Sequence, residues 1–319
     1  MENKLISIAM ATFNGEKFLK KQLDSIYKQT YKNLEVIVSD DYSVDGTIEI
    51  LEEYRQNFGL KFFVNEEKIG PMGNFAHAIA QCRGNYIALA DQDDVWLPEK
   101  LEILSNNINQ HSLICSNAYL IDCRGRIVGN LLQNNYTIPI RKKDQFKLLP
   151  YRFSALGCLS MFKKELLSQV LPIPIGASHD WWIAFVATKL NGIKYLDIPL
   201  IYYRQHPESF TGELKGNNFW KNALRFFFSN KEHNRRNRMT KLHYNELKAI
   251  MDSPIFSKPE REYLKEATDY YEDLLESKLH LKAVSMEIKK RRILYQPYSS
   301  SRINSYLRKW LNILAIAFF

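Results

Sequence analysis

Three carboxylates lie within four residues of this chain, in the stretch "YIALADQDDVWLPEKL" (86–101). Asp91, Asp93 and Asp94 follow a short apolar run that we expect to be a strand. Carboxylates this close raise one another's pKa unless positive charge lies between them. An Asp-x-Asp at a strand end can hold Mg2+ or Mn2+, with a bound diphosphate supplying further oxygen ligands. The competing interpretation is local: Asp91 is solvated and one of the other two caps the helix expected from Pro98, most naturally Asp94.

A second acidic pair, Asp40 and Asp41, stands in "SDDYSVDGT" (39–47), again after an apolar run. A carboxylate there can accept a hydrogen bond from the N3–H of uracil or thymine, and a nearby aromatic ring can stack on that base. Phe13 and Asn14 in "ATFNGE" could form a wall of the same pocket, although an aromatic residue after a strand is more often core. A turn with Asx hydrogen bonds explains the Asp-Gly that follows, but it does not require the tandem acids.

A third motif, "HDWW", places Asp180 at the start of an expected helix, where the helix dipole favours its ionised form. An ionised carboxylate beside a sugar hydroxyl can act as a general base, and an N-cap role is the alternative. We expect that Trp181 and Trp182 cannot both face the core, so that one of them offers a platform to an acceptor sugar. Arg204 and His206 in "YYRQH" could contact phosphate or ligate a metal ion, or be hydrogen-bonded only.

These motifs need a scaffold that brings them together, and the apolar pattern predicts one. Expected strands at 5–10, 34–39, 61–65, 86–90 and 113–120 alternate with expected helices at 16–29, 46–57, 73–82 and 98–108. Such alternation predicts a parallel sheet with helices on both faces, and ligands then bind at the carboxyl ends of the strands. The polar clusters follow the first, second and fourth of these strands, which predicts one shared site.

The rest of the chain is less regular. Residues 121–152 are predicted to be irregular, with the basic run 141–143 in a loop or lid. We then expect a strand and helix at 154–167, a buried helix at 179–190 and a strand pair at 193–206. From 220 the pattern becomes helical, with a heptad-like stretch at 261–292 and an amphipathic end at 302–319.

The charge is placed unevenly. Residues 1–219 hold 24 Lys and Arg against 24 Asp and Glu, whereas residues 220–319 hold 20 against 11, so the excess of +9 lies in the last hundred. This indicates an anionic partner: a membrane surface is favoured by the aromatics among these basic residues, Trp220, Phe226–Phe228 and Trp310, and we expect no nucleic acid because no such module is recognisable. A solvated helical cap or a dimerisation arm stays open. Four scattered cysteines suit a reducing cytoplasm, and we expect neither a signal peptide nor a spanning helix.

The order of the motifs is more specific than any one of them. "ATFNG", "VIVSDDYSVDGT", "GNYIALADQDDVWLPEKL", "HDWW" and "YRQH" together resemble the glycosyltransferase family 2 pattern over residues 4–212, most closely that of bacterial rhamnosyltransferases of surface-polysaccharide assembly. The resemblance implies an α/β GT-A nucleotide-diphospho-sugar transferase fold with a Rossmann-like mixed, mainly parallel sheet. The catalytic domain would span 1–219, and 220–319 would be a helical basic region for membrane association or dimerisation.

The resemblance also implies roles for matched positions. Phe13 would stack on the pyrimidine, Asp41 with Asp40 beside it would read the imide edge, and Asp180 would be the catalytic base. Asp91 and Asp93 would hold Mn2+ or Mg2+, with His206 as a further contact. The implied donor-binding residues are Ala11, Phe13, Asn14, Asp40, Asp41, Asn74, Asp91 and Arg204. Gly73 stands where many members carry Arg or Lys, so Lys68, Arg204 or residues 141–143 would have to meet the diphosphate charge.

The implied activity is inverting transfer of a sugar, with dTDP-L-rhamnose as the favoured donor and a polyprenyl-diphosphate-linked saccharide as acceptor. The enzyme would act at the inner face of the cell membrane, as a peripheral protein and possible oligomer. A UDP-hexose transferase of the same family is the alternative. A nucleotidyltransferase of related fold is disfavoured, because "ATFNGEKF" lacks a Gly-rich loop with a Lys or Arg signature. A non-catalytic nucleotide-sugar-binding module would not need Asp180.

Overall fold

The structure is a computed structural model that describes residues 4–130, 142–151, 157–206 and 230–276. The chain divides into two compact units, which are described separately. The first comprises residues 1–142, 153–173 and 178–216, and the second comprises 143–152, 174–177 and 217–319. The predicted domain division between 219 and 220 remains a prediction.

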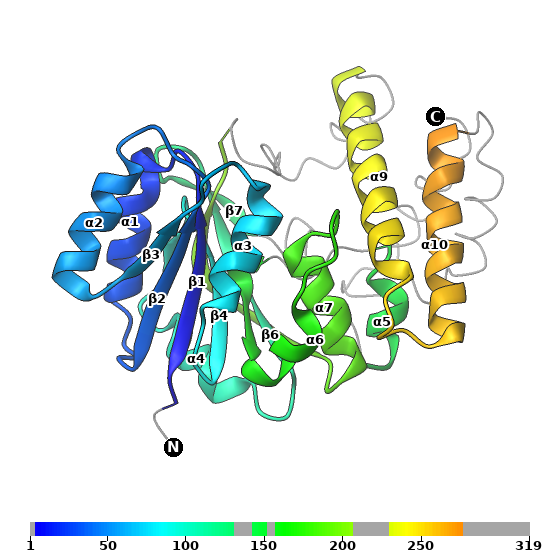
Figure 1. The fold of residues 1–319 in the computed structure, drawn as a ribbon, viewed down its shortest axis with the longest axis horizontal. Coiled ribbons are helices and arrows are strands. Elements are labelled where there is room, and N and C mark those ends of the chain that lie inside the picture. The colour runs from blue at the N-terminus through cyan, green and yellow to red at the C-terminus, as the bar shows by residue number, and fades with distance from the viewer. Residues whose placement is uncertain (1–3, 131–141, 152–156, 207–229, 277–319) are drawn as a thin grey trace. The chain divides into compact units, whose positions relative to one another are not determined.

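The first unit is built on one mixed sheet (Figure 1). Its strand order is β3 (Lys61–Val64), β2 (Leu34–Asp40), β1 (Ile6–Thr12), β4 (Tyr86–Asp91), β8 (Ser160–Lys163), β6 (Leu113–Ile121), β9 (Ile193–Arg204) and β5 (Val95–Trp96), with β7 (Ile127–Asn130) paired to β6. The first four strands are parallel, as are β6 and β9, whereas β8 runs antiparallel between β4 and β6. The longest pairings are the parallel ones, and the predicted mixed, mainly parallel sheet is confirmed.

Helices cover both faces of this sheet (Figure 1). They are α1 (Glu16–Tyr27), α2 (Thr47–Phe58), α3 (Gly70–Ala80), α4 (Lys100–Asn107), α6 (Leu167–Val170) and α7 (His179–Lys189). Alternate residues of β1 point to opposite faces, so Ile6, Ile8 and Met10 join one core cluster with side chains of α1, α2 and α4. The helical spacing predicted for 16–29 is confirmed, because the apolar face of α1 is buried.

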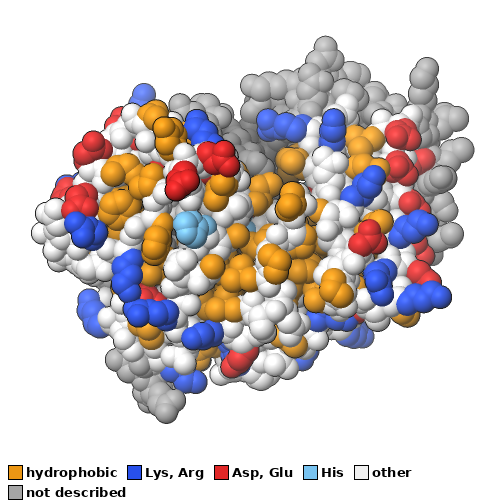
Figure 2. All heavy atoms as spheres, viewed as in Figure 1, with side chains coloured by type: hydrophobic (Ala, Val, Ile, Leu, Met, Phe, Trp, Pro, Cys, Tyr) orange, Lys and Arg blue, Asp and Glu red, His pale blue; other side chains and the backbone are white. Residues whose placement is uncertain are grey.

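The surface of this unit carries both signs of charge. On the face that Figure 2 presents, acidic and basic side chains are interspersed with hydrophobic ones. This mixture agrees with the balanced charge of residues 1–219. An anionic partner would therefore be recruited by local groups or by the basic C-terminal hundred rather than by the net charge of this unit.

The second unit is helical in its described part, with α5 (Gln145–Leu148), α9 (Asn230–Met251) and α10 (Lys258–Glu276). Tyrosines of α10 fasten the short segment at 143–151, since Tyr263 Oη donates to the Lys147 carbonyl at 2.9 Å and Tyr271 Oη to the Pro150 carbonyl at 2.8 Å. Among the described residues no helix is both long and apolar enough to cross a membrane. The predicted aromatic and amphipathic segments at 220–228 and 302–319, and the heptads after 276, lie outside the described residues.

Two expectations for secondary structure are wrong. The strand pair predicted for 193–206 is instead one long strand, β9 (Ile193–Arg204), which pairs in parallel with β6 and does not fold back on itself. Residues 121–152 are not wholly irregular, because the Asp122 carboxylate accepts backbone N–H bonds from Arg124 and Arg126 and Gly125 has a φ of 84°. These contacts turn the chain, so that β7 pairs with β6.

Candidate active site

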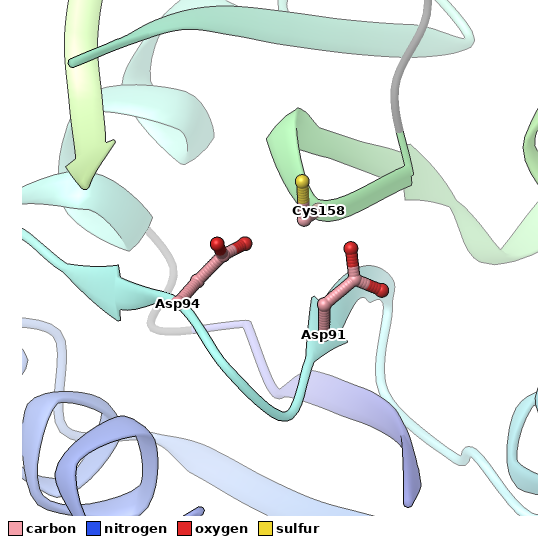
Figure 3. A group of neighbouring side chains, drawn as sticks. All are labelled: Asp91, Asp94 and Cys158. Carbon is pink, nitrogen blue, oxygen red and sulfur yellow. The ribbon is translucent and has the colours of Figure 1, made fainter. Parts of the chain in front are cut away.

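The acidic turn after β4 gathers charge at the carboxyl end of the sheet. Asp91 is the last residue of β4 and lies beside Ala11 of β1 in the strand register. Carboxylate oxygens of Asp91 and Asp94 and the Cys158 sulfur lie within 4.8 Å of one another, with Cys158 facing the two acids from the 3-10 turn η2 (Gly157–Leu159) (Figure 3). Burial, then the nearby charges of Asp93 and Asp180, raise the pKa of Asp91 to about 7. The predicted crowding of carboxylates is confirmed.

The next two acids have different partners. Asp93 Oδ2 lies 2.7 Å from His206 Nε2. Asp94 is buried, its Oδ1 accepts the Arg204 backbone N–H at 2.9 Å, and burial raises its pKa well above the usual range. The helix-cap interpretation is wrong, since α4 begins at Lys100 with Glu99 in the N-cap position. Asp94 nevertheless has the local role expected for it.

A cation of the protein itself, Lys100, lies near this cluster, and it was not among the predicted site residues. Lys100 is fully buried, its Nζ donates to the Cys158 carbonyl at 2.5 Å, and it lies 3.7 Å from the centre of the Trp96 ring. Burial lowers the pKa of Lys100 to about 8, opposed by the attraction of Asp94 and Asp91. The positive charge expected between the acids is thus partly supplied by the chain itself.

The predicted base-binding loops lie side by side at the ends of β1 and β2. The Phe13 ring is 38% exposed, and Lys68 Nζ lies 4.4 Å from its centre. Asp41 is 6% exposed. Its Oδ1 accepts the Ile69 N–H at 2.8 Å and the Asn65 amide at 3.3 Å, and its Oδ2 accepts the Gly70 N–H at 3.0 Å. A carboxylate has about four lone-pair sites, so Asp41 keeps acceptor capacity for the imide N–H of a base.

Asp40 has a different place from its neighbour. It is 0% exposed, and its carboxylate accepts the Thr12 hydroxyl at 2.7 Å, the Ser43 hydroxyl at 2.7 Å and the Ser43 N–H at 2.8 Å. A carboxylate with no exposed surface cannot contact a bound base, whereas Asp41 retains some exposure. The expectation that Asp40 reads the donor with Asp41 is therefore wrong, and Asp40 instead ties the end of β2 to the end of β1.

The two asparagines brace these loops. Asn14 has a φ of 45°, its N–H donates to Ser43 Oγ at 2.8 Å, and its Oδ1 accepts the Val44 N–H at 3.0 Å. Asn74 is buried, and its amide donates to the Thr12 carbonyl at 3.0 Å while accepting from Asn65. Their predicted direct contacts with the donor remain predictions. These hydrogen bonds connect the loops after β1 and β2 to each other and to α3.

Asp180 faces the acidic turn across η2. Ser178 is the N-cap of α7, so the N-cap interpretation of Asp180 is wrong. Its Oδ1 accepts the Trp181 N–H at 2.8 Å and its Oδ2 the Gly157 N–H at 3.2 Å. Because Gly157 and Cys158 are consecutive, η2 connects Asp180 directly to Asp91, whose pKa the Asp180 charge raises. Asp180, the predicted base, thus lies near Asp91, one of the predicted metal ligands.

The tryptophans after Asp180 contradict the expectation for them. Trp181 and Trp182 are 1% and 2% exposed, so both are buried and neither presents a platform to an acceptor sugar. Trp182 Nε1 donates to the Val170 carbonyl at 2.8 Å, and the Trp181 ring packs against Phe185 at 5.6 Å. Both residues hold α7, and hence Asp180, in position.

Arg204 also differs from the prediction of a donor contact. It is buried, its Nε donates to the Asp93 carbonyl at 2.7 Å and an Nη to the Asp122 carbonyl at 3.3 Å, and its guanidinium lies 4.6 Å from the Phe18 ring centre. These contacts hold the acidic turn from the β9 side. Arg204 is therefore assigned to shaping the turn, and the diphosphate charge has to be met by other groups.

The donor set can be tested for a divalent cation. Mg2+ and Mn2+ prefer carboxylate oxygens, which Asp91 and Asp93 offer at the strand end. Cys158 is a poor ligand for such an ion, because burial raises its pKa well above the usual value and keeps the thiol protonated. The carboxylates of the acidic turn therefore fit a hard cation. Asp91 and Asp93 remain its predicted ligands, and Asp93 Oδ2 is held by the 2.7 Å contact to His206 Nε2.

A mainly parallel sheet that brings these acids together at its carboxyl edge is the arrangement of a GT-A nucleotide-diphospho-sugar transferase. The sequence profile of "Glycosyl transferase family 2" matches residues 7–171, more than half of the chain, and the chain belongs to this family. The "dTDP-rhamnosyl transferase RfbG" of Shigella flexneri is 30% identical over 225 residues, which are 64% of this chain and 73% of that one. The expected rhamnosyltransferase-like kinship is confirmed.

Other similar proteins are named for donor sugars other than rhamnose. The "UDP-Glc:alpha-D-GlcNAc-diphosphoundecaprenol beta-1,3-glucosyltransferase WfgD" of Escherichia coli is 29% identical over 206 residues, 63% of this chain and 76% of that one. Among solved structures, the mannosyltransferase PcManGT of Pyrobaculum calidifontis, in complex with GDP-Man and Mn2+, has a TM-score of 0.54 at 17% identity, covering 98% of this chain and 86% of that one. The structure of S. aureus TarS 1–349 in complex with UDP-GlcNAc has a TM-score of 0.54 at 18% identity, covering 91% of this chain and 88% of that one. These two structures support the fold.

Proposed function

We propose that this family 2 glycosyltransferase moves L-rhamnose from dTDP-rhamnose, with inversion, onto a lipid-linked saccharide of a cell-surface polysaccharide. The observation that supports the proposal is the link through η2 between Asp180 and Asp91, since Asp180 would then be a proton acceptor beside the acids proposed to bind the donor. The relative named as a dTDP-rhamnosyl transferase supports the donor. A UDP-hexose donor is the second candidate, favoured by the relative named for UDP-Glc at almost the same identity.

Asp180 would act as the general base. Its carboxylate is held by two backbone N–H groups, which fix its direction. In a single displacement it would take the proton of the acceptor hydroxyl as that oxygen attacks the anomeric carbon, on the face opposite the nucleotide. Phe13 would stack on the pyrimidine and Asp41 would accept the imide N–H, and together they would hold the base of the donor.

Mn2+ or Mg2+ is the proposed cofactor, held by Asp91 and Asp93. When bound, such a cation neutralises charge that develops on the departing diphosphate. The Mn2+ named in the PcManGT complex supports a divalent cation. The gathering of carboxylates after β4 also supports it, since oxygens of Asp91 and Asp94 lie within 4.8 Å of each other. Asp93 is oriented by His206, so this pair would present one carboxylate oxygen to the ion.

The donor and the reaction type are tested together by product release. The protein is incubated with a panel of nucleotide-sugars, including dTDP-rhamnose, UDP-glucose, UDP-galactose and UDP-GlcNAc, with MnCl2 and a lipid-linked saccharide acceptor. We expect dTDP from dTDP-rhamnose. UDP from a UDP-hexose would select the second candidate, pyrophosphate would indicate a nucleotidyltransferase, and binding without release of any nucleotide would indicate a non-catalytic module.

Removal of the metal should abolish this release. We expect EDTA to stop turnover and MnCl2 or MgCl2 to restore it, while Asp93→Ala should weaken donor binding roughly 10-fold or more only when metal is present. Isothermal titration of dTDP with and without MnCl2 measures this effect. His111→Ala, which changes a histidine away from the acidic turn, serves as the control. Undiminished activity of the wild type in EDTA would remove the metal from the proposal.

We further propose that the enzyme works at the cytoplasmic face of the cell membrane, held there by its basic C-terminal hundred. Acceptors named as diphosphoundecaprenol-linked in two relatives support a membrane substrate. We expect binding to vesicles that contain anionic lipid, with a decline at high salt and a loss on deletion of residues 295–319. Sedimentation with vesicles measures both. If the protein instead forms dimers that persist at high salt and does not bind vesicles, the C-terminal region would be a dimerisation arm.

A further inference from the structure

One residue of the acidic turn has no part in the chemistry above. Gln92 is uncharged and stands between Asp91 and Asp93, yet its side chain makes two reciprocal hydrogen bonds to the backbone of Phe13. The Phe13 N–H donates to Oε1 at 2.9 Å, and Nε2 donates to the Phe13 carbonyl at 3.0 Å. The paired register of β1 and β4 ends at Ala11 and Asp91. The glutamine amide therefore continues the connection beyond the point where the two backbones stop pairing.

Gly15 leaves the space for this contact. A Cβ at residue 15 would lie 2.3 Å from Oε1 and 2.8 Å from Cδ of Gln92, and the third nearest atom, at 3.5 Å, also belongs to Gln92. Its backbone has a φ of −99° and a ψ of 4°, which any L-residue tolerates. Gly15 thus leaves room for the Gln92 amide, and a side chain at this position would displace that amide rather than strain the backbone.

We propose that Gln92 is a positioning residue that couples the base-binding loop, residues 13–15, to the acids that hold the metal. This inference rests on the proposed function, in which Phe13 binds the base and Asp91 and Asp93 hold the cation at the diphosphate. Base and diphosphate belong to one molecule, so the spacing between the two loops has to match the length of a nucleotide. The Gln92 amide sets that spacing, with one hydrogen bond in each direction.

The test uses the crowding of Gly15 against Gln92. We expect Gln92→Ala to weaken dTDP binding in the presence of MnCl2 roughly 10-fold, the scale of one or two lost hydrogen bonds. Gly15→Ala should weaken it more or lower the melting temperature, because the new methyl group overlaps the amide. The double variant Gly15→Ala/Gln92→Ala should return to the level of Gln92→Ala alone, since the overlapping atoms are gone.

A second glycine provides the matched control. Gly46 also precedes a helix, has a φ of −68°, and has Glu16 as the nearest neighbour of its absent Cβ at 3.0 Å. Gly46→Ala should therefore be unaffected by Gln92→Ala, and the two effects should add. If Gln92→Ala suppresses the effects of Gly15→Ala on both the melting temperature and the dTDP affinity, the proposal is supported, even if Gly15→Ala alone folds poorly. Simple additivity of Gly15→Ala and Gln92→Ala overturns it.

A second measurement separates positioning from mere support of the fold. In the wild type, MnCl2 should raise the affinity for dTDP by some factor, because base and cation are held at a fixed spacing. Gln92→Ala should lower that factor as well as the affinity itself. An unchanged factor would overturn the coupling role. Failure of the wild type to bind dTDP or UDP at all would instead overturn the proposed function, so the two failures are distinguishable.

Discussion

Asp180→Asn is expected to lower the rate of sugar transfer about 100- to 10,000-fold, while the affinity for dTDP stays close to that of the wild type. Asparagine keeps the size of the side chain, and its carbonyl oxygen can still accept one of the two N–H bonds that Trp181 and Gly157 make to the separate oxygens of Asp180. It cannot take a proton from the acceptor. The loss should therefore appear in kcat, with little change in the KM for the donor.

The measurement is a steady-state assay of nucleoside diphosphate release, paired with calorimetric titration of dTDP and MnCl2. Asp24→Asn is a suitable control. Asp24 lies on α1, outside the acidic turn, and its carboxylate accepts the Tyr54 hydroxyl. It makes the same chemical change and should leave turnover near the wild-type value. Activity of Asp180→Asn within a few-fold of the wild type would exclude Asp180 as the base.

Lys100→Met is expected to lower the free energy of unfolding by roughly 3 kcal/mol, the scale seen when one partner of a buried charged pair is removed. Methionine fills similar space but leaves the Cys158 carbonyl without its ammonium donor. It also removes a cation whose charge interacts with both Asp94 and Asp91. We also expect lower activity, because Lys100 holds Cys158 in η2 and the neighbouring Gly157 N–H bonds Asp180.

Chemical denaturation measures the effect, and Lys164→Met is the matched control. Lys164 also donates to a backbone carbonyl, that of Arg83 at 3.2 Å, but it is exposed, so its loss should cost less than about 0.5 kcal/mol. In the double variant Lys100→Met/Asp94→Asn part of the stability should return, because the unpaired carboxylate is gone. If both lysine variants lose equal stability, Lys100 has no special electrostatic role.

The sheet and the meeting of the acids could be predicted from the sequence, because local patterns determine both. Apolar runs of strand length fix the strands, and parallel strands end at one edge, where Asp41, Asp91 and Asp93 stand. The expectation for Trp181 and Trp182 failed for a physical reason. We expected adjacent helical residues to face different environments, but every residue from Trp181 to Ala187 is buried, so α7 is packed on all sides.

Lys100 and Gln92 were missed because their partners are distant in sequence. A signal for Lys100 existed, since Lys100, Leu104 and Ile108 are spaced by four residues and the lysine falls on the buried stripe of α4. Periodicity could have placed it inside, but not beside Cys158, 58 residues away. Gln92 gave no signal at all, because its role depends on the space that Gly15 leaves and on a hydrogen bond to Phe13.

The acidic turn is held from segments far apart along the chain, and this bears on when it can form during folding. Gln92 bonds a residue 79 positions earlier, whereas Asp94 and Asp93 bond residues 110 and 113 positions later. Contacts of such large sequence separation form slowly and late. Arg204 and His206 also lie beyond residue 171, where the match to the family profile ends. A chain shortened to that match would keep all four residues of "DQDD" but would lack the partners that hold Asp93 and Asp94, and during synthesis the site would mature only after residue 206 has been made.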